Sequence, residues 1–209
     1  MEILKIKAVV FDCDGVLFDT ALANRKYYDE VLAAFNKPAL NEEQFINVHM
    51  MTVKEAIEYL FPEIRDLSSV YERLSHIGYH KFINYMVMEE GLKELLAALK
   101  NKGYIRGIAT NRTNTMEKVL EDFHLKNDFE IVVTAATVKH PKPDPEQLLL
   151  IMEKYQLNPH EILFIGDSEY DRQAAAAAGV WFAGFKNPGL KADVNVVSMD
   201  EIGGILQIN

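Results

Sequence analysis

The chain has 209 residues, of which 49% are hydrophobic, and a formal net charge of −9. This length and composition allow a sizeable core, either in one domain with an insertion or in two small domains. The negative charge argues against nucleic acid or an anionic membrane as the main partner, although a locally charged site can still bind an anionic substrate.

The cysteine count and the apolar pattern bear on localisation. The single cysteine, Cys13, cannot form an internal disulfide, which fits a reducing cytoplasm. No uninterrupted apolar stretch approaches transmembrane length, and the N-terminal residues lack the features of a signal peptide. We therefore expect a cytoplasmic protein that binds neither nucleic acid nor membranes.

The first predicted strand, residues 8–11, is apolar throughout and ends in two aspartates, Asp12 and Asp14. Carboxylates at the carboxyl end of a buried strand lie where open α/β sheets bind their ligands. One of them can act as a nucleophile and the other as a general acid and base. A shared Mg²⁺ would offset their repulsion. An acidic turn without chemistry is the alternative for this motif taken alone.

Residues 20–88 show helical periodicity and no convincing strand. Apolar residues recur at roughly helical spacing from Leu22 to Phe35. Asn41 offers an N-cap for a second helix, and residues 52–55 have capping-box spacing for a third. A longer helical pattern runs from about residue 66 to 88. We therefore predict an all-helical module inserted directly after the first strand.

Strands and helices alternate from residue 91 onward. Strands are predicted at 104–110, 131–134, 162–166, 180–185 and 194–197, and helices at 92–99, 114–124, 143–155, 170–178 and from about 200. This βαβ series predicts an α/β fold with a doubly wound parallel sheet and right-handed crossovers. The predicted core comprises residues 1–19 and 89–209, and residues 20–88 form the helical insertion.

Three later segment ends carry polar side chains. Thr110 and Asn111 end a strand before a helix, an arrangement that binds phosphate but also serves as a plain cap. Lys142 lies between prolines, which restrict its backbone, so it can pair with a phosphate and a nucleophilic carboxylate. A solvated loop lysine is the alternative. Asp167 at a strand end and Asp171 in the next helix suit a hard cation or, more simply, an acidic first turn.

These motifs together resemble the haloacid dehalogenase superfamily, in the branch that carries a helical cap and includes phosphoglycolate phosphatase and β-phosphoglucomutase. The resemblance covers essentially the whole predicted core, whereas the insertion matches only in its helical character. It implies a Rossmann-like core with sheet order 5-4-1-2-3 in the family's strand numbering. It also implies that residues 20–88 form the cap.

The resemblance implies specific roles for the site residues. Asp12 would form an aspartyl phosphate, while Asp14 would serve as general acid and base and bind Mg²⁺ through its backbone carbonyl. Thr110 and Lys142 would hold the phosphoryl group.

The implied metal site uses further carboxylates. Asp167 would complete the Mg²⁺ site with Asp12, and Asp171 would support it from nearby or through water. Asp12, Asp14, Asp167 and Asp171 are therefore the predicted metal residues.

Hydrolysis of a small phosphorylated metabolite is the predicted reaction. A dehalogenase of this superfamily would not need Asp14. The caps of sugar-phosphate mutases carry an arginine near the loop that meets the active site, and residues 47–54, which we expect to form this loop, contain none. A mutase nevertheless stays an alternative, and a non-catalytic binding protein on the same fold is another.

Substrate selectivity is expected to lie partly in the cap. His49, Met50 and Met51 are the candidates there, with ordinary core packing of the methionines as the alternative. Asn111 is a further candidate for binding substrate. We expect Arg112 and His140 to be solvated surface residues rather than contacts of the leaving group.

Overall fold

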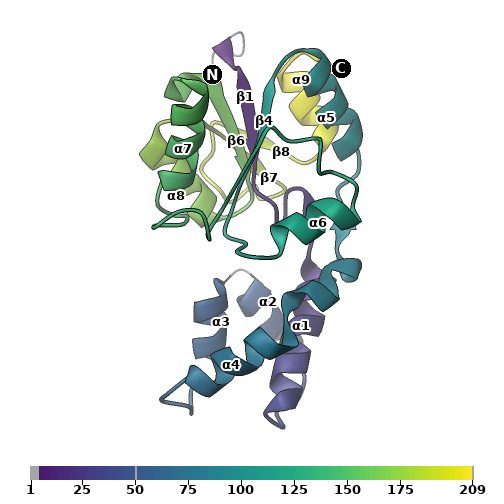
Figure 1. Cartoon of the computed structure of the whole chain (residues 1–209), viewed down its shortest axis with the longest axis vertical. Coiled ribbons are helices and arrows are strands. Elements are labelled where there is room, and N and C mark those ends of the chain that lie inside the picture. Colours follow the sequence, from purple (N-terminus) through teal and green to yellow (C-terminus); the bar gives the residue numbers. More distant parts are fainter. Residues whose placement is uncertain (1–4, 50, 209) are drawn as a thin grey trace. The chain divides into compact units, whose positions relative to one another are not determined.

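The computed structural model describes residues 5–49 and 51–208. The chain divides into two compact units. The first comprises the segments up to Asp19 and from Met88 onward, and the second comprises Thr20–Val87 (Figure 1). No helix within the described residues is long and apolar enough to cross a lipid bilayer.

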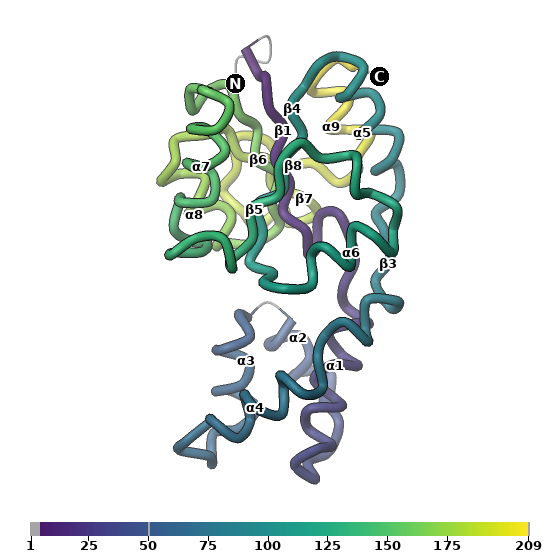
Figure 2. The backbone as a smooth tube through the Cα atoms, viewed as in Figure 1, coloured from purple at the N-terminus to yellow at the C-terminus, as the bar shows by residue number. Residues whose placement is uncertain are grey.

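The first unit is built on a six-stranded sheet in which every pairing is parallel. In order across the sheet, its strands are β5 (Ile131–Thr134), β4 (Ile105–Thr110), β1 (Ala8–Phe11), β6 (Ile162–Gly166), β7 (Trp181–Phe185) and β8 (Val194–Val196). Figure 2 shows β5 beside β4. Counted in chain order within this sheet, the first five strands follow the predicted order, read from the opposite edge, and β8 adds a sixth strand beyond β7. The α/β prediction is confirmed.

Strand β1 is buried on both faces because helices cover both sides of the sheet. The helices α7 (Glu146–Tyr155) and α8 (Glu169–Ala178) lie on one side, and α5 (Leu92–Asn101) and α9 (Met199–Ile205) on the other (Figure 1). Ala8 and Val10 pack in the core cluster that includes Leu148 of α7 and Ala174 of α8. Val9 and Phe11 point to the other face, and all four strand residues are fully buried. This double coverage explains the uninterrupted apolar run.

The second unit is helical. Its elements are α1 (Ala21–Ala34), α2 (Glu42–His49), α3 (Val53–Leu60), α4 (Ser68–Ile77) and the 3₁₀ helix η2 (Tyr79–Tyr85). The ring of Tyr27 on α1 packs against the rings of Tyr79 and Phe82 on η2. The predicted capping box of α3 is present between Thr52 and Glu55.

The prediction of one long helix from residue 66 to 88 is wrong. Gly78 has a φ of 67°, a left-handed conformation that ends α4, and the chain continues as η2. The prediction of no strand in this region is also wrong, because β3 (Val87–Met88) pairs with β2 (Phe18–Asp19) in a two-stranded sheet. Two short segments of this kind carry too few residues to show a period.

The remaining predicted elements are present with shifted ends. The helix predicted at 114–124 is α6 (Met116–Asp122), and α7 begins three residues later than predicted, at Glu146. A short 3₁₀ helix, η3 (Pro159–Glu161), precedes β6. None of these shifts moves a predicted site residue away from the carboxyl end of its strand.

Candidate active site

The candidate active site lies at the carboxyl ends of three neighbouring strands. Asp12 follows β1, Thr110 ends β4, and Asp167 follows β6. Because β1 pairs with β4 on one side and with β6 on the other, these three residues meet at one edge of the sheet. This edge is where open α/β sheets bind ligands.

Lys142 is the buried cation of this site. Its side chain is 3% exposed, and its Nζ donates to Asp12 Oδ1 at 2.7 Å, Asp171 Oδ1 at 2.6 Å and the carbonyl of Ala109 at 2.9 Å. Burial alone would lower the pKa of Lys142, but the carboxylates of Asp12 and Asp171 raise it above its usual value. Lys142 is therefore a fixed ammonium ion rather than a solvated loop lysine.

Three carboxylates form a cluster at this site, and Lys142 contacts two of them, Asp12 and Asp171. Asp12, Asp167 and Asp171 each offer an oxygen, and these oxygens lie within 4.8 Å of one another. Burial, reinforced by the neighbouring carboxylates, raises the pKa of Asp12 to about 7 and that of Asp167 to about 8, although Lys142 opposes both shifts. The cluster thus holds more negative charge than one lysine balances. A hard divalent cation fits such a set of oxygens.

Both carboxylate oxygens of Asp171 are engaged by protein groups. Its Oδ1 accepts from Lys142, and its Oδ2 accepts from the backbone N–H and the hydroxyl of Ser168. The hydroxyl of Ser168 in turn accepts from the backbone N–H of Asp171, which completes a capping box at the start of α8. Asp171 thus holds Lys142 in place and caps α8 with the same carboxylate.

Two glycines allow these carboxylates to approach closely. A Cβ on Gly15, whose φ is +76°, would lie 2.0 Å from Asp167 Oδ2. A Cβ on Gly166 would lie 2.3 Å from the Cβ of Asp171. Any side chain at either position would displace a carboxylate of the cluster.

Asp14 forms a two-point ion pair with Arg112. Arg112 Nε donates to Asp14 Oδ2 at 2.8 Å, and Nη2 donates to Asp14 Oδ1 at 2.6 Å. The side chain of Arg112 is 7% exposed, so the prediction of a solvated surface residue is wrong. Sequence reasoning missed this pair because the two residues stand 98 positions apart, and only the position of Arg112 just after a strand end pointed to it.

The strand-end residues of β4 are linked to Lys142 and α7. Thr110 is buried, and its hydroxyl accepts from the backbone N–H of Arg112 at 3.2 Å. Asn111 is exposed, and its side chain donates to the carbonyl of Lys142 at 2.9 Å. Gln147, which the sequence did not single out, is fully buried and donates to the carbonyl of Thr110 at 2.8 Å.

The two described cap candidates belong to the second unit. His49 is the last residue of α2, stacks on Phe45 and lies 3.3 Å from the amide nitrogen of Asn24. Met51 is half-buried between α2 and α3, and Met50 lies outside the described residues. The predicted loop over residues 47–54 is much shorter than expected, because its first three residues end α2 and its last two begin α3. His140 is exposed, as predicted.

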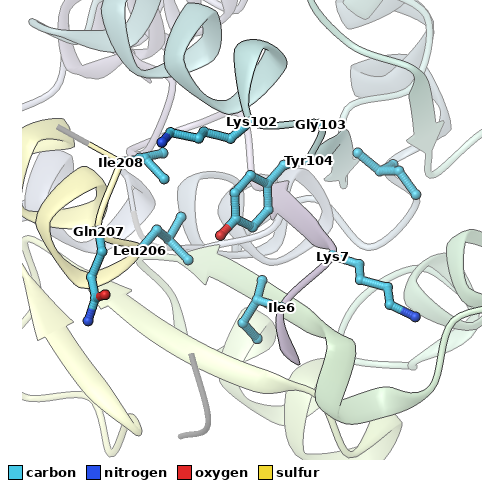
Figure 3. A pocket seen from close by; sticks show the side chains of 9 residues that line it. Ile6, Lys7, Lys102, Gly103, Tyr104, Leu206, Gln207 and Ile208 are labelled. Carbon is cyan, nitrogen blue, oxygen red and sulfur yellow. The ribbon is translucent and has the colours of Figure 1, made fainter. Parts of the chain in front are cut away.

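A separate cavity lies at the opposite end of the sheet. It has a volume of about 500 Å³, and its lining includes Lys7 just before β1, Tyr104 just before β4, and Leu206 after α9 (Figure 3). Since Lys7 and Tyr104 lie at the amino ends of β1 and β4, the cavity is not part of the carboxylate site.

Comparison with known proteins shows which family this chain belongs to. The family model described as haloacid dehalogenase-like hydrolase matches residues 9–185. The chain belongs to this family. It is 32% identical over 198 residues to a phosphoglycolate phosphatase of Shigella dysenteriae, covering 83% of this chain and 79% of the relative. It is 30% identical over 186 residues to an N-acetylmuramic acid 6-phosphate phosphatase of Pseudomonas aeruginosa, covering 86% and 81%.

A solved structure agrees with this assignment. A haloacid dehalogenase-superfamily hydrolase of subfamily IA from Geobacter sulfurreducens is 40% identical, with a TM-score of 0.83 and 97% of each chain covered. Family membership and the phosphatase relatives identify this member of the haloacid dehalogenase-like family as a phosphoric monoester hydrolase. The alternative of a non-catalytic binding protein is thereby set aside.

Proposed function

We propose that the protein hydrolyses a small phosphorylated metabolite through an aspartyl phosphate on Asp12, with Mg²⁺ as cofactor. The observation that carries this proposal is the contact of buried Lys142 with Asp12 and Asp171, beside Asp167. Lys142 bonds Asp12 at Oδ1, so the other carboxylate oxygen can attack phosphorus. The ammonium group of Lys142 also offers positive charge to the phosphoryl oxygens.

The proposed first step transfers the phosphoryl group to the protein. A carboxylate oxygen of Asp12 attacks phosphorus, and the bond from phosphorus to the leaving oxygen breaks. The leaving oxygen takes a proton from Asp14 and departs as an alcohol. Lys142 and the hydroxyl of Thr110 hold the phosphoryl oxygens during the transfer.

The proposed second step regenerates the site. A water molecule attacks the phosphorus of the aspartyl phosphate while Asp14 accepts its proton. The bond between Asp12 and phosphorus breaks, which releases inorganic phosphate and restores both carboxyl groups to their starting states.

The carboxylate cluster fits a divalent cation by its chemistry and its excess negative charge. Asp12 and Asp167 would hold Mg²⁺ through their side chains, together with the backbone carbonyl of Asp14, and the ion would neutralise charge on the phosphoryl group. Because its two oxygens are engaged by Lys142 and Ser168, Asp171 would support the site indirectly.

The substrate class follows from the relatives and from the second unit. Two relatives are phosphatases of phosphoglycolate and of N-acetylmuramic acid 6-phosphate, so a phosphorylated organic acid or sugar is the proposed substrate class. Residues 20–87 would act as the cap that selects the leaving group, with His49 and Met51 among the contacts and Asn111 on the core side. The absence of arginine from residues 47–54 supports hydrolysis rather than a mutase reaction.

The test is a screen of phosphorylated metabolites for phosphate release with wild-type protein and Asp12→Asn. The wild type should turn over at least one metabolite, lose activity in excess chelator and regain it with Mg²⁺. Asp12→Asn should retain its melting temperature and lose turnover, because an amide cannot form the acyl phosphate. Mutant activity within about tenfold of wild type would refute the nucleophile assignment, since nucleophile removal costs far more. Full activity in chelator would refute the metal.

A further inference from the structure

The backbone of Arg112 is anchored just beyond β4. Its N–H donates to the hydroxyl of Thr110 at 3.2 Å, and its carbonyl accepts from the N–H of Ala135 at 3.0 Å. The backbone of Arg112 is therefore fixed, and its side chain, which is only 7% exposed, has little room to move.

Within residues 5–49 and 51–208, the guanidinium of Arg112 donates to oxygens of two side chains, Asp14 and Thr115. Nε and Nη2 donate to the two carboxylate oxygens of Asp14 at 2.8 and 2.6 Å, and Nη1 donates to the hydroxyl of Thr115 at 3.1 Å. A planar guanidinium that bonds both oxygens fixes the plane and direction of a carboxylate, which a single ammonium contact does not. Thr115 immediately precedes α6, so the guanidinium is itself held at a third point.

Packing alone does not hold Asp14. Its side chain is 37% exposed, in contrast to the buried Asp171, so its torsions would be free without a partner. Proton transfer needs Asp14 within about 2.6–3.2 Å of the leaving oxygen. Each carboxylate oxygen has two lone-pair sites, so bonding to Arg112 leaves one site on each oxygen for a proton.

We propose that Arg112 is a positioning residue that holds the Asp14 carboxylate in the orientation from which it exchanges protons with the leaving group and the attacking water. This inference rests on the proposed function, in which Asp14 is the general acid and base. Arg112 then acts on the reaction through Asp14, and its Nε and Nη2 atoms do not bind the phosphoryl group.

The test compares an alkyl phosphate from the substrate screen with p-nitrophenyl phosphate in single turnovers. Nitrophenolate leaves without a proton, so its release should depend little on the orientation of Asp14. Arg112→Gln should slow alcohol release by about tenfold to a hundredfold, as expected for a misplaced catalytic group. It should slow nitrophenolate release by less than about threefold and, in separate steady-state assays, leave KM for both substrates nearly unchanged.

Two further variants test whether the rate loss comes from lost positioning of Asp14, from a lost positive charge or from impaired folding. Arg112→Lys retains the charge but not the two-point fork, so it should show the same selective loss. Lys118→Gln removes one positive charge from the exposed pair with Asp122 on α6, and it should leave both rates unchanged. Melting temperatures of all variants identify any that are merely destabilised.

A double-mutant cycle decides whether Arg112 acts through Asp14. In an Asp14→Asn background, Arg112→Gln should change alcohol release by less than about twofold, because the group that it positions is already lost. Equal losses for the two substrates, a loss confined to KM, additive effects in the cycle or full rescue by lysine would each overturn the inference. Absence of a selective loss in Asp14→Asn alone would instead refute the proposed acid role.

Discussion

At the scale of single residues, Lys142 bonds the carboxylates of Asp12 and Asp171, and Arg112 bonds that of Asp14. The sequence indicated Asp12, Lys142, Asp167 and Asp171 as a group, because each follows or precedes a core element at the same edge of a parallel sheet. It gave no sign that Asp171 engages both Lys142 and Ser168. Such contacts depend on rotamers in the folded core, which spacing along the chain does not determine.

The close approach of Gly15 to Asp167 leads to a prediction with a matched control. Gly15→Ala should place a Cβ 2.0 Å from Asp167 Oδ2, displace that carboxylate and raise the Mg²⁺ concentration needed for half-maximal activity. Gly103 has a similar φ of +79°, but a Cβ there would meet no atom within 4 Å. Gly103→Ala should therefore lose only about 1–2 kcal/mol of stability. Equal Mg²⁺ requirements in the two variants would contradict the steric argument. Activity titrations with Mg²⁺ and thermal unfolding measure both quantities.

The raised pKa values predict how the stability of metal-free protein depends on pH. Asp12 and Asp167 have pKa values of about 7 and about 8, above the ordinary aspartate value of 3.8. Between about pH 4 and 8 these two carboxyl groups therefore bind more protons in the folded protein than in the unfolded chain, so their contribution to the free energy of unfolding falls as pH rises. The melting temperature in chelator should decrease from about pH 5.5 to 8.5 more steeply in wild type than in Asp167→Asn.

Mg²⁺ should reverse this trend. Ionised carboxylates bind the cation and protonated ones do not, so the rise in melting temperature on adding Mg²⁺ should grow over the same pH range. A Mg²⁺-induced rise that is independent of pH, or a pH slope unchanged in Asp167→Asn, would contradict the assignment of these shifts to the carboxylate cluster.

At the scale of elements, the strands of the six-stranded sheet and the α-helices that follow them were predictable because local pattern and tertiary role agree. β1 is apolar without interruption because helices cover both faces of the sheet, and α8 ends at Gly179 in the left-handed conformation that a glycine C-cap predicts. The region from residue 66 to 88 was not predictable in the same way. There Gly78 breaks a continuous helical pattern, and β3 exists only through its pairing with β2.

The N-terminal cap of α8 links element stability to the site. Ser168→Ala should destabilise the protein by about 1 kcal/mol, the usual cost of losing a side-chain cap. It should also lower kcat, by up to about tenfold, because Asp171 loses a hydrogen bond that orients it toward Lys142.

Ser198 provides the matched control for this cap. Its side chain accepts from the backbone N–H of Glu201 at the start of α9, so Ser198→Ala should cost similar stability without lowering kcat. Denaturant unfolding and steady-state kinetics of the two variants make the comparison. Equal kcat losses would mean that the effect of Ser168 is general destabilisation rather than positioning of Asp171.

At the scale of the whole molecule, the chain leaves the first unit at Asp19 and returns to it at Met88. Every charged contact described around Asp12, Asp14 and Lys142 lies within the first unit. We therefore propose that the chemical step takes place in that unit and that the second unit selects among leaving groups. The sequence predicted the helical character of the insertion but not which groups its side chains contact. Helical periodicity shows which face of a helix is buried, but not what that face packs against or binds.

This division predicts that substitutions in the two units have different kinetic effects. His49→Ala and Met51→Ala should change the relative kcat/KM values among phosphate esters with different leaving groups, because cap contacts would discriminate between those groups. Thr110→Ala should lower kcat/KM for all esters by a similar factor, because every ester presents the same phosphoryl group. Arg73→Ala, at an exposed position on α4, is the control for general effects of cap substitution.

The measurement is kcat/KM for a panel of phosphate esters at one saturating Mg²⁺ concentration. His49 contacts Asn24 and stacks on Phe45, so His49→Ala also needs a melting curve to separate lost selectivity from a loosened helical unit. A destabilised helical unit would lower kcat/KM for all esters together, whereas a lost substrate contact would change the rank order of the kcat/KM values. If the cap variants preserve the rank order while Thr110→Ala changes it, leaving-group selection belongs to the first unit and the proposed division is reversed.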